Sequence, residues 1–185
     1  MKRQPDAWKK GPEQEPLDFR IFKLRQLQAA DPRDGKLHPR VYLECGDWVN
    51  VIPVTKSGEV VMIRQFRFGT WSLTLEIPGG MVDEGEDPAV AGARELEEET
   101  GFRAGRLLSL GWCHPNPAIL TNRLHTFLAL DCERLHAGAP DEAEDIEVTL
   151  VARAQVEQLL RDGQITHSAV ICAFFFEQLR GPGAR

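Results

Sequence analysis

Features that would place this chain outside the ordinary globular proteins are scarce. Its longest apolar run, AVICAFFF at residues 169–176, is far too short to span a bilayer. The opening stretch MKRQPDAWKKGPEQEP has no apolar core, so we do not expect a signal peptide. The four cysteines stand singly, without the CxxC spacing of zinc or redox sites, which indicates reduced thiols in a cytoplasmic protein.

An excess of positive charge is also lacking. Asp and Glu number 28 against 22 Lys and Arg, for a net charge of -6. This balance argues against a nucleic acid or a membrane surface as the partner, but a small anionic ligand remains compatible if cations mediate its binding. With 185 residues, 42% hydrophobic and 27% charged, the chain can bury a core of its own.

The order of the expected elements indicates a mixed α/β fold. Hydrophobic patterning and turn residues predict strands at 17–27, 40–44, 48–55, 60–66, 73–77, 106–113, 123–130 and 146–151, with helices at 88–100, 153–162 and 168–180. We expect a flexible N-terminal tail over residues 1–16, an N-terminal strand region over 17–56 and the main domain over 57–185.

The helix at 88–100 concentrates acidic residues. Asp87-Pro88 predicts its start and Gly101 its end. A helical wheel gathers one packing face from Ala89, Ala93, Leu96 and Thr100, and points Glu97 toward solvent.

Three carboxylates, Glu95, Glu98 and Glu99, share another side of this helix, near the small residues Ala91 and Gly92. Like charges at this spacing repel by a few tenths of a kcal/mol per pair. A divalent cation with oxygen ligands would remove the repulsion, and small neighbours leave room for another segment to approach. The alternative is a solvated acidic face.

The whole string GGMVDEGEDPAVAGARELEEETGF, residues 79–102, resembles the signature of the Nudix hydrolases at every specified position. The resemblance implies a loop–helix–loop on an α/β/α sandwich, with Mg²⁺, or Mn²⁺ as the alternative, held by the helix glutamates. In that family water attacks a phosphorus of a nucleoside diphosphate linked to a second group.

Matched by position, the resemblance assigns roles within this string. Glu95 and Glu99 correspond to the principal metal ligands, with Glu98 close behind and the carbonyl of Gly79 as a further ligand. Arg94 would orient the glutamates, so it joins Glu98 among the expected catalytic residues. Glu86 would brace the loop against the helix, and Gly80 supports the same turn.

The stretch RQFRFGTWSLTLEIPGG at 64–80 is similar to the ADP-ribose pyrophosphatases and related nucleoside-diphosphate-sugar hydrolases. The similarity implies that Arg67 contacts a phosphate and that Glu76 lies on the ligand side or beside the metal. The alternative for Arg67 is a strand-end arginine paired with an acid. Asn116-Pro117-Ala118 departs from the Ser-Pro-Gly usual in that subgroup, which keeps other nucleotide sugars open.

Two further regions follow from the same resemblance. The acidic segment DEAEDIEV at 141–148 corresponds to a loop that supplies the catalytic base, with Glu142 as first choice and Glu144 as the alternative. N-terminal strands are exchanged between two subunits in related enzymes, so we expect a homodimer in which Phe19 and Phe22 contact the base. Trp48 and Trp71 are compatible with base stacking or with core packing.

Together these features predict a Mg²⁺-dependent pyrophosphohydrolase of nucleoside-diphosphate sugars. ADP-ribose is the first candidate, giving a nucleoside monophosphate and a sugar phosphate. GDP-mannose or a similar nucleotide sugar is the alternative. A sensor that binds nucleotide derivatives without hydrolysing them is a third, which the intact acidic helix disfavours.

Overall fold

The computed structural model describes residues 4–140 and 145–180, and its contacts divide the chain into two units. The first unit comprises residues 1–46 and 116–122, and the second comprises 47–115 and 123–185. The second unit begins before the predicted boundary at 57, because strand β5 (Trp48–Thr55) pairs with strands β11, β6 and β8 of that unit.

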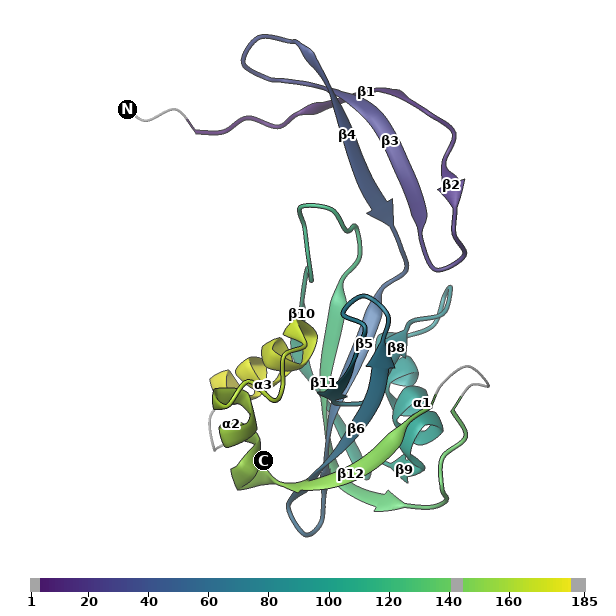
Figure 1. Cartoon of the computed structure of the whole chain (residues 1–185), viewed down its shortest axis with the longest axis vertical. Coiled ribbons are helices and arrows are strands. Elements are labelled where there is room, and N and C mark those ends of the chain that lie inside the picture. Colours follow the sequence, from purple (N-terminus) through teal and green to yellow (C-terminus); the bar gives the residue numbers. More distant parts are fainter. Residues whose placement is uncertain (1–3, 141–144, 181–185) are drawn as a thin grey trace. The chain divides into compact units, whose positions relative to one another are not determined.

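The first unit is a four-stranded antiparallel sheet (Figure 1). Its central strand β3 (Lys23–Ala30) pairs with β1 (Lys9–Glu13), β2 (Leu17–Asp18) and β4 (Leu37–Glu44). The prediction of a loose tail is therefore wrong for β1. Its sequence, KKGPE, has no alternation of hydrophobic and polar residues that would predict a strand. The predicted strand at 17–27 is broken by a tight turn, in which Phe19 donates its N–H to the Phe22 carbonyl at 2.9 Å and Arg20 takes a φ of 68°.

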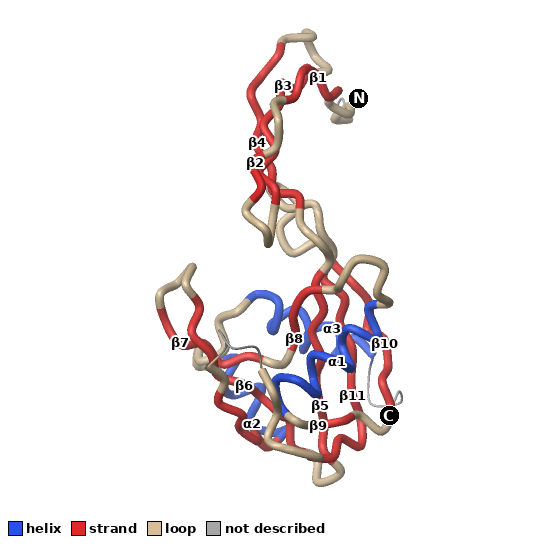
Figure 2. The backbone as a smooth tube through the Cα atoms, turned by 90° about the vertical axis from the view of Figure 1, so that its right-hand side faces the viewer, coloured by secondary structure: helices blue, strands red, loops and turns tan. Residues whose placement is uncertain are grey.

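The second unit is built on an eight-stranded mixed sheet whose main path runs β10–β11–β5–β6–β12. β11 and β5 are parallel and the other pairs are antiparallel. The strand bounds are β6 (Glu59–Arg67), β7 (Ser72–Glu76), β8 (Gly79–Met81), β9 (Phe102–Arg103), β10 (Arg106–Cys113), β11 (Leu124–Arg134) and β12 (Glu147–Ala152). The hairpin that joins β6 to β7 extends from the body of this unit (Figure 2).

Helices cover both faces of this sheet (Figure 1). α1 (Pro88–Thr100) packs on one face over a core that includes Val51 and Leu96. α2 (Arg153–Arg161) and α3 (Ser168–Arg180) pack on the other face over a second core that includes Ile52. The predicted α/β/α sandwich is confirmed. None of the helices in the described part of the chain is both long and apolar enough to cross a membrane.

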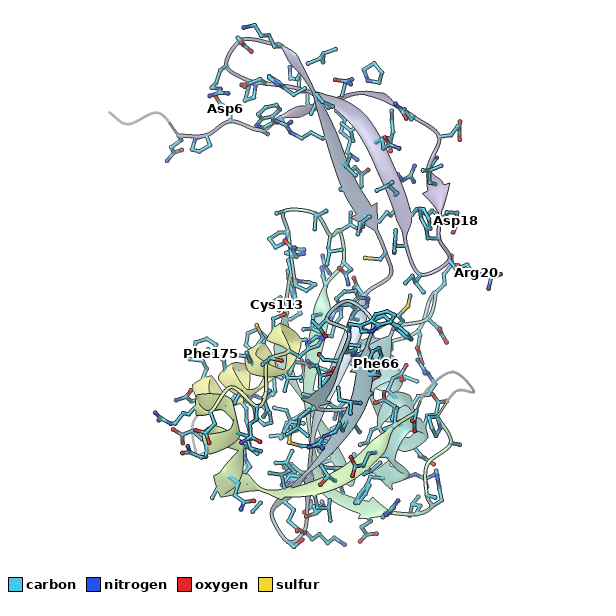
Figure 3. All side chains as sticks on the ribbon, viewed as in Figure 1. Asp6, Asp18, Arg20, Phe66, Cys113 and Phe175 are labelled. Carbon is cyan, nitrogen blue, oxygen red and sulfur yellow. The ribbon has the colours of Figure 1, made fainter. Side chains whose placement is uncertain are left out.

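The phenylalanine run of α3 divides between core and surface. Phe174 is buried in the second core, whereas Phe175 lies on the outer side of the helix with 56% of its surface exposed (Figure 3). Successive helical residues are rotated by about 100°, so three neighbours cannot share one face.

Local signals fix α1 at both ends. The Asp87 carboxylate accepts the Ala89 N–H at 2.8 Å, and Gly101 closes the helix with a φ of 73°. The predicted packing face is wrong for Ala93, which is exposed. The sheet instead packs against the side of the helix that carries Gly92. A Cβ added to Gly92 would lie only 3.1 Å from methyl groups of Val49 and Val51.

Candidate active site

The three glutamates of α1 differ in exposure. Glu99 is buried at 3% exposure, the Glu95 side chain is 15% exposed, and the Glu98 side chain is 49% exposed. Glu97 is not simply solvated: it lies apart from them, in an ion pair with Arg103 at 2.8 Å. The three glutamates that the sequence places on one side of the helix thus form a row that runs from the interior to the surface. Glu99 lies at its buried end and Glu98 at its exposed end.

Arg94 ties this row to the preceding loop. Its Nη1 donates to Glu95 Oε1 and to Glu98 Oε2, both at 2.9 Å. Its Nε and Nη2 donate to the two oxygens of Glu86 at 3.1 Å, and Nη2 also donates to the Met81 carbonyl at 3.1 Å. One guanidinium thus serves three carboxylates, which leaves an excess of negative charge for a further cation to neutralise.

Glu86 has the bracing geometry that the sequence predicts. It binds Arg94 through both oxygens and accepts the Asp83 N–H at 3.0 Å, so it closes the loop before the helix. The hydrogen bonds from Arg94, and then that from Asp83, hold the pKa of Glu86 below its ordinary value. The Glu86 hydrogen bond is also the main cause that raises the pKa of Arg94, so this pair stays charged.

Two glycines bring the backbone against the glutamates. Gly79 donates its N–H to Glu99 Oε2 at 2.9 Å, and a Cβ added there would lie 2.3 Å from the Val49 carbonyl oxygen. A Cβ added to Gly80 would meet the Glu95 carboxylate at 2.5–2.7 Å. Strand β8, which is not among the strands predicted from the sequence, can approach the glutamates this closely because its first two residues have no side chain.

A divalent ion fits this donor set by its chemistry. The carboxylates supply the oxygen ligands that hard cations prefer, and glycine at position 80 avoids the clash that a Cβ would make with the Glu95 carboxylate. Within the described residues, no three His, Cys, Asp or Glu side chains are already arranged around a common metal position. Glu95 and Glu98 are instead bridged by Arg94 Nη1, which donates to both carboxylates.

A cavity of about 260 Å³ adjoins the two glycines. Its polar lining comes from Asn50, Arg67, Glu76 and His167, and its apolar lining from Trp48, Val49, Ile77, Met81, Leu124, Ala169 and Val170. The strands β5, β7 and β8 and the first turn of α3 supply most of these residues.

Arg67 and Glu76 form a bidentate ion pair in this cavity, with Nε and Nη2 each donating at 2.8 Å. Thr74 donates to Glu76 at 2.6 Å. Burial acts to raise the pKa of Glu76, but the hydrogen bonds from Arg67 and Thr74 outweigh it, so the pKa lies below its ordinary value. Both predicted substrate residues line the cavity, and the strand-end pairing considered for Arg67 is present as well.

Two polar residues of the cavity were not identified from the sequence. Asn50 interrupts the apolar strand WVNVIPVT and is only 5% exposed. A polar residue within such a strand is the signal that could have found it, because buried polar groups need a partner. His167 precedes the closing helix at a capping position, a signal that the sequence analysis did not use.

The remaining predicted residues stand as follows. Phe19 and Phe22 lie on a turn of the first unit with their rings 5.2 Å apart, and their role at the base stays a prediction. Trp48 lines the cavity. Trp71 is 75% exposed on the β6–β7 hairpin, so core packing is wrong for it. Residues 141–144, which include Glu142 and Glu144, lie outside the described part of the chain.

Comparison with known proteins identifies the family. A model of the NUDIX domain matches residues 47–174. The ADP-ribose pyrophosphatase of Bacillus subtilis (strain 168) is 30% identical over 148 residues, which is 80% of each chain. The GDP-mannose pyrophosphatase of Escherichia coli (strain K12) is 33% identical over 144 residues, 72% of this chain and 75% of the other.

The crystal structure of an ADP compounds hydrolase has the same fold, with a TM-score of 0.84, 23% identity and 98% coverage of both chains. The chain belongs to the NUDIX domain family, and the predicted resemblance is confirmed. It is a Nudix hydrolase, a class of enzymes that generally use a divalent metal ion.

Proposed function

We propose that this enzyme is a Mg²⁺-dependent pyrophosphohydrolase of nucleoside-diphosphate sugars, with ADP-ribose as its first candidate substrate. The observation that carries the proposal is the row of α1 glutamates, two of them bound by Arg94, beside a cavity that is lined by the Arg67–Glu76 ion pair. The relatives named ADP-ribose pyrophosphatase and GDP-mannose pyrophosphatase support the same substrate class.

In this proposal Glu95, Glu98 and Glu99, with the Gly79 carbonyl, hold the metal. Mg²⁺, with Mn²⁺ as the alternative, would neutralise and polarise the diphosphate and lower the pKa of a bound water. Arg94 keeps the glutamates oriented through the hydrogen bonds described above. Water attacks one of the two phosphorus atoms, the bridging anhydride bond breaks, and a nucleoside monophosphate and a sugar phosphate leave.

The proton of the attacking water passes, in this proposal, to Glu142, or alternatively to Glu144. The described chain on either side supports this assignment. Ala139 donates its N–H to the Glu98 carbonyl at 2.7 Å, at the last turn of the metal-binding helix. On the other side β12 begins at Glu147, which is in register with Arg64 of β6. Ala139 therefore contacts the last turn of α1, the helix that carries the proposed metal ligands.

GDP-mannose is the second candidate substrate, because relatives of that name reach 33% identity. In either case Arg67 would contact a phosphate, and Glu76 would hold Arg67 in place through their bidentate pair.

We further propose a homodimer with exchanged N-terminal strands, in which Phe19 and Phe22 complete the base pocket. The first unit exposes large apolar side chains, among them Ile21 at 64% and Leu37 at 53%. Replacing Ile21 by Lys is expected to yield monomers in light scattering. An unchanged dimer would contradict the role of this surface. We also propose a cytoplasmic location, in keeping with the reduced thiols that the unpaired cysteine spacing predicts.

The test is hydrolysis by the purified chain with Mg²⁺, offered ADP-ribose, GDP-mannose and dinucleotide polyphosphates, with products identified by mass. Glu99→Gln keeps the acceptor for the Gly79 N–H but removes the charge, so activity should fall about a thousandfold or more. Glu97→Gln, on the same helix but outside the row, is the matched control and should remain active. No turnover of any nucleotide sugar by the parent chain would refute the function and leave the sensor alternative.

A further inference from the structure

His167 caps the first turn of α3, and this turn forms one wall of the cavity. The His167 carbonyl accepts N–H bonds from Val170 at 3.0 Å and Ile171 at 3.1 Å, and its Nδ1 accepts the Ala169 N–H at 3.1 Å. A ring nitrogen that accepts a hydrogen bond carries no proton, so the neutral imidazole has its proton on Nε2. The cap therefore gives His167 a defined donor.

The capped turn is fixed to the sheet. Asn50 of β5 donates from Nδ2 to the Ala169 carbonyl at 3.0 Å. Both backbone groups of Ala169 are thus engaged, one by His167 and one by Asn50. Because Asn50 is buried in the central strand, the imidazole sits on a rigid support rather than on a loose loop.

The size and lining of the cavity indicate what it takes. At about 260 Å³ it is smaller than the roughly 300–1,000 Å³ of sites that enclose a whole drug-sized ligand, so it fits one part of a nucleotide sugar. Glu76 can accept about one more hydrogen bond, since a carboxylate offers about four acceptor positions and Arg67 and Thr74 fill three of them. A hydroxyl group both donates and accepts, so it can bind between a carboxylate and an imidazole N–H.

We infer that His167 donates a hydrogen bond from Nε2 to a sugar hydroxyl of the substrate and so helps to determine specificity. This inference rests on the proposed function. His167 touches the sugar and not the reacting phosphorus, so its removal weakens binding more than it slows chemistry.

Two replacements separate this donor from the helix cap. Asparagine caps helices well, so His167→Asn keeps the cap of α3, but its side chain is too short to place an N–H where the Nε2–H of His167 lies. His167→Gln places an amide N–H near the position of Nε2 but caps poorly. We expect His167→Asn to raise KM for ADP-ribose about two- to tenfold, as for one neutral hydrogen bond, with kcat nearly unchanged. His167→Gln should recover most of that loss, although its melting temperature falls. His114→Asn, the same change at a histidine that does not line the cavity, is the control.

Product inhibition shows which sugar is bound. Weaker inhibition of His167→Asn by ribose 5-phosphate places the hydroxyl on the terminal sugar, and weaker inhibition by AMP places it on the nucleoside. Either result supports the inference. Unchanged KM and unchanged inhibition by both products would overturn it, as would a Gln variant no better than the Asn variant. A parent chain that hydrolyses the substrate separates these outcomes from failure of the proposed function itself.

Discussion

Replacing Arg94 by Lys isolates the role of the guanidinium from that of its charge. Arg94 makes four hydrogen bonds to the carboxylates of Glu86, Glu95 and Glu98, and one to the Met81 carbonyl. Lysine has three donors on a single nitrogen, so it cannot reach both the loop and the helix row. The net charge is unchanged, and any effect therefore comes from lost geometry.

The expected loss follows from these contacts. Hydrogen bonds to charged groups contribute about 1.5–3 kcal/mol when buried, and the Arg94 side chain is 30% exposed, so about 1 kcal/mol for each is reasonable. At least two bonds are lost, which gives about 2 kcal/mol. For a chain of this size that corresponds to a fall in Tm of about 4–8 °C.

The assay is thermal unfolding of the parent and Arg94→Lys at neutral pH without added metal. Arg103→Lys is the matched control, because Arg103 also binds a glutamate of α1, Glu97, through two nitrogens but is 63% exposed. Because that pair is exposed to solvent, Arg103→Lys should lower the Tm less than Arg94→Lys does. If Arg94→Lys is no less stable than Arg103→Lys, the bridging role assigned to Arg94 is wrong.

Three further changes test the surrounding site. Gly80→Ala forces its Cβ against the Glu95 carboxylate, so Mg²⁺ affinity measured by calorimetry should fall about tenfold, whereas Gly69→Ala, with open space around it, should leave that affinity unchanged. The folded-state pKa of Glu76 lies below its ordinary value near 4.5, so its ionised form stabilises the fold above that pH and the benefit is lost as pH falls through the folded-state pKa. The stability difference between parent and Glu76→Gln in urea should therefore shrink from pH 7 to pH 3, and a difference that grows would contradict the sign. Asn50→Asp replaces a buried donor by a buried charge and should cost about 3 kcal/mol in the same urea measurement, and an unchanged midpoint would show that its bond to α3 is dispensable.

Local chemistry made the acidic helix predictable from sequence. An Asp N-cap, a proline in the first turn and a glycine after the last turn are short-range signals, and the structure places α1 between the same two residues, Pro88 and Thr100. The strand β5 was predicted with its observed bounds as well, because its apolar run ends at the turn before Gly58. Such elements need no knowledge of their partners.

Elements defined by pairing could not be found in this way. β1 contains Lys9, Lys10, Gly11 and Pro12, which favour no strand, and it exists because β3 offers an edge. β8 consists of two glycines and a methionine that pair with β5. The burial of Glu95, Glu98 and Glu99 also depends on which side of α1 packs against the sheet. A helical wheel drawn from the sequence does not contain this information. The cavity is likewise tertiary, since Asn50 and Ala169 are 119 positions apart.

Binding of Mn²⁺ tests the central claim most directly, since paramagnetic resonance reports the bound ion without any turnover. The account predicts that the parent chain binds Mn²⁺ and that Mg²⁺ displaces it. Glu95→Gln and Glu99→Gln should each weaken binding about tenfold or more, while Glu97→Gln binds as the parent does. Equal binding by all four proteins, or no binding by the parent, would contradict a metal site on the α1 glutamates.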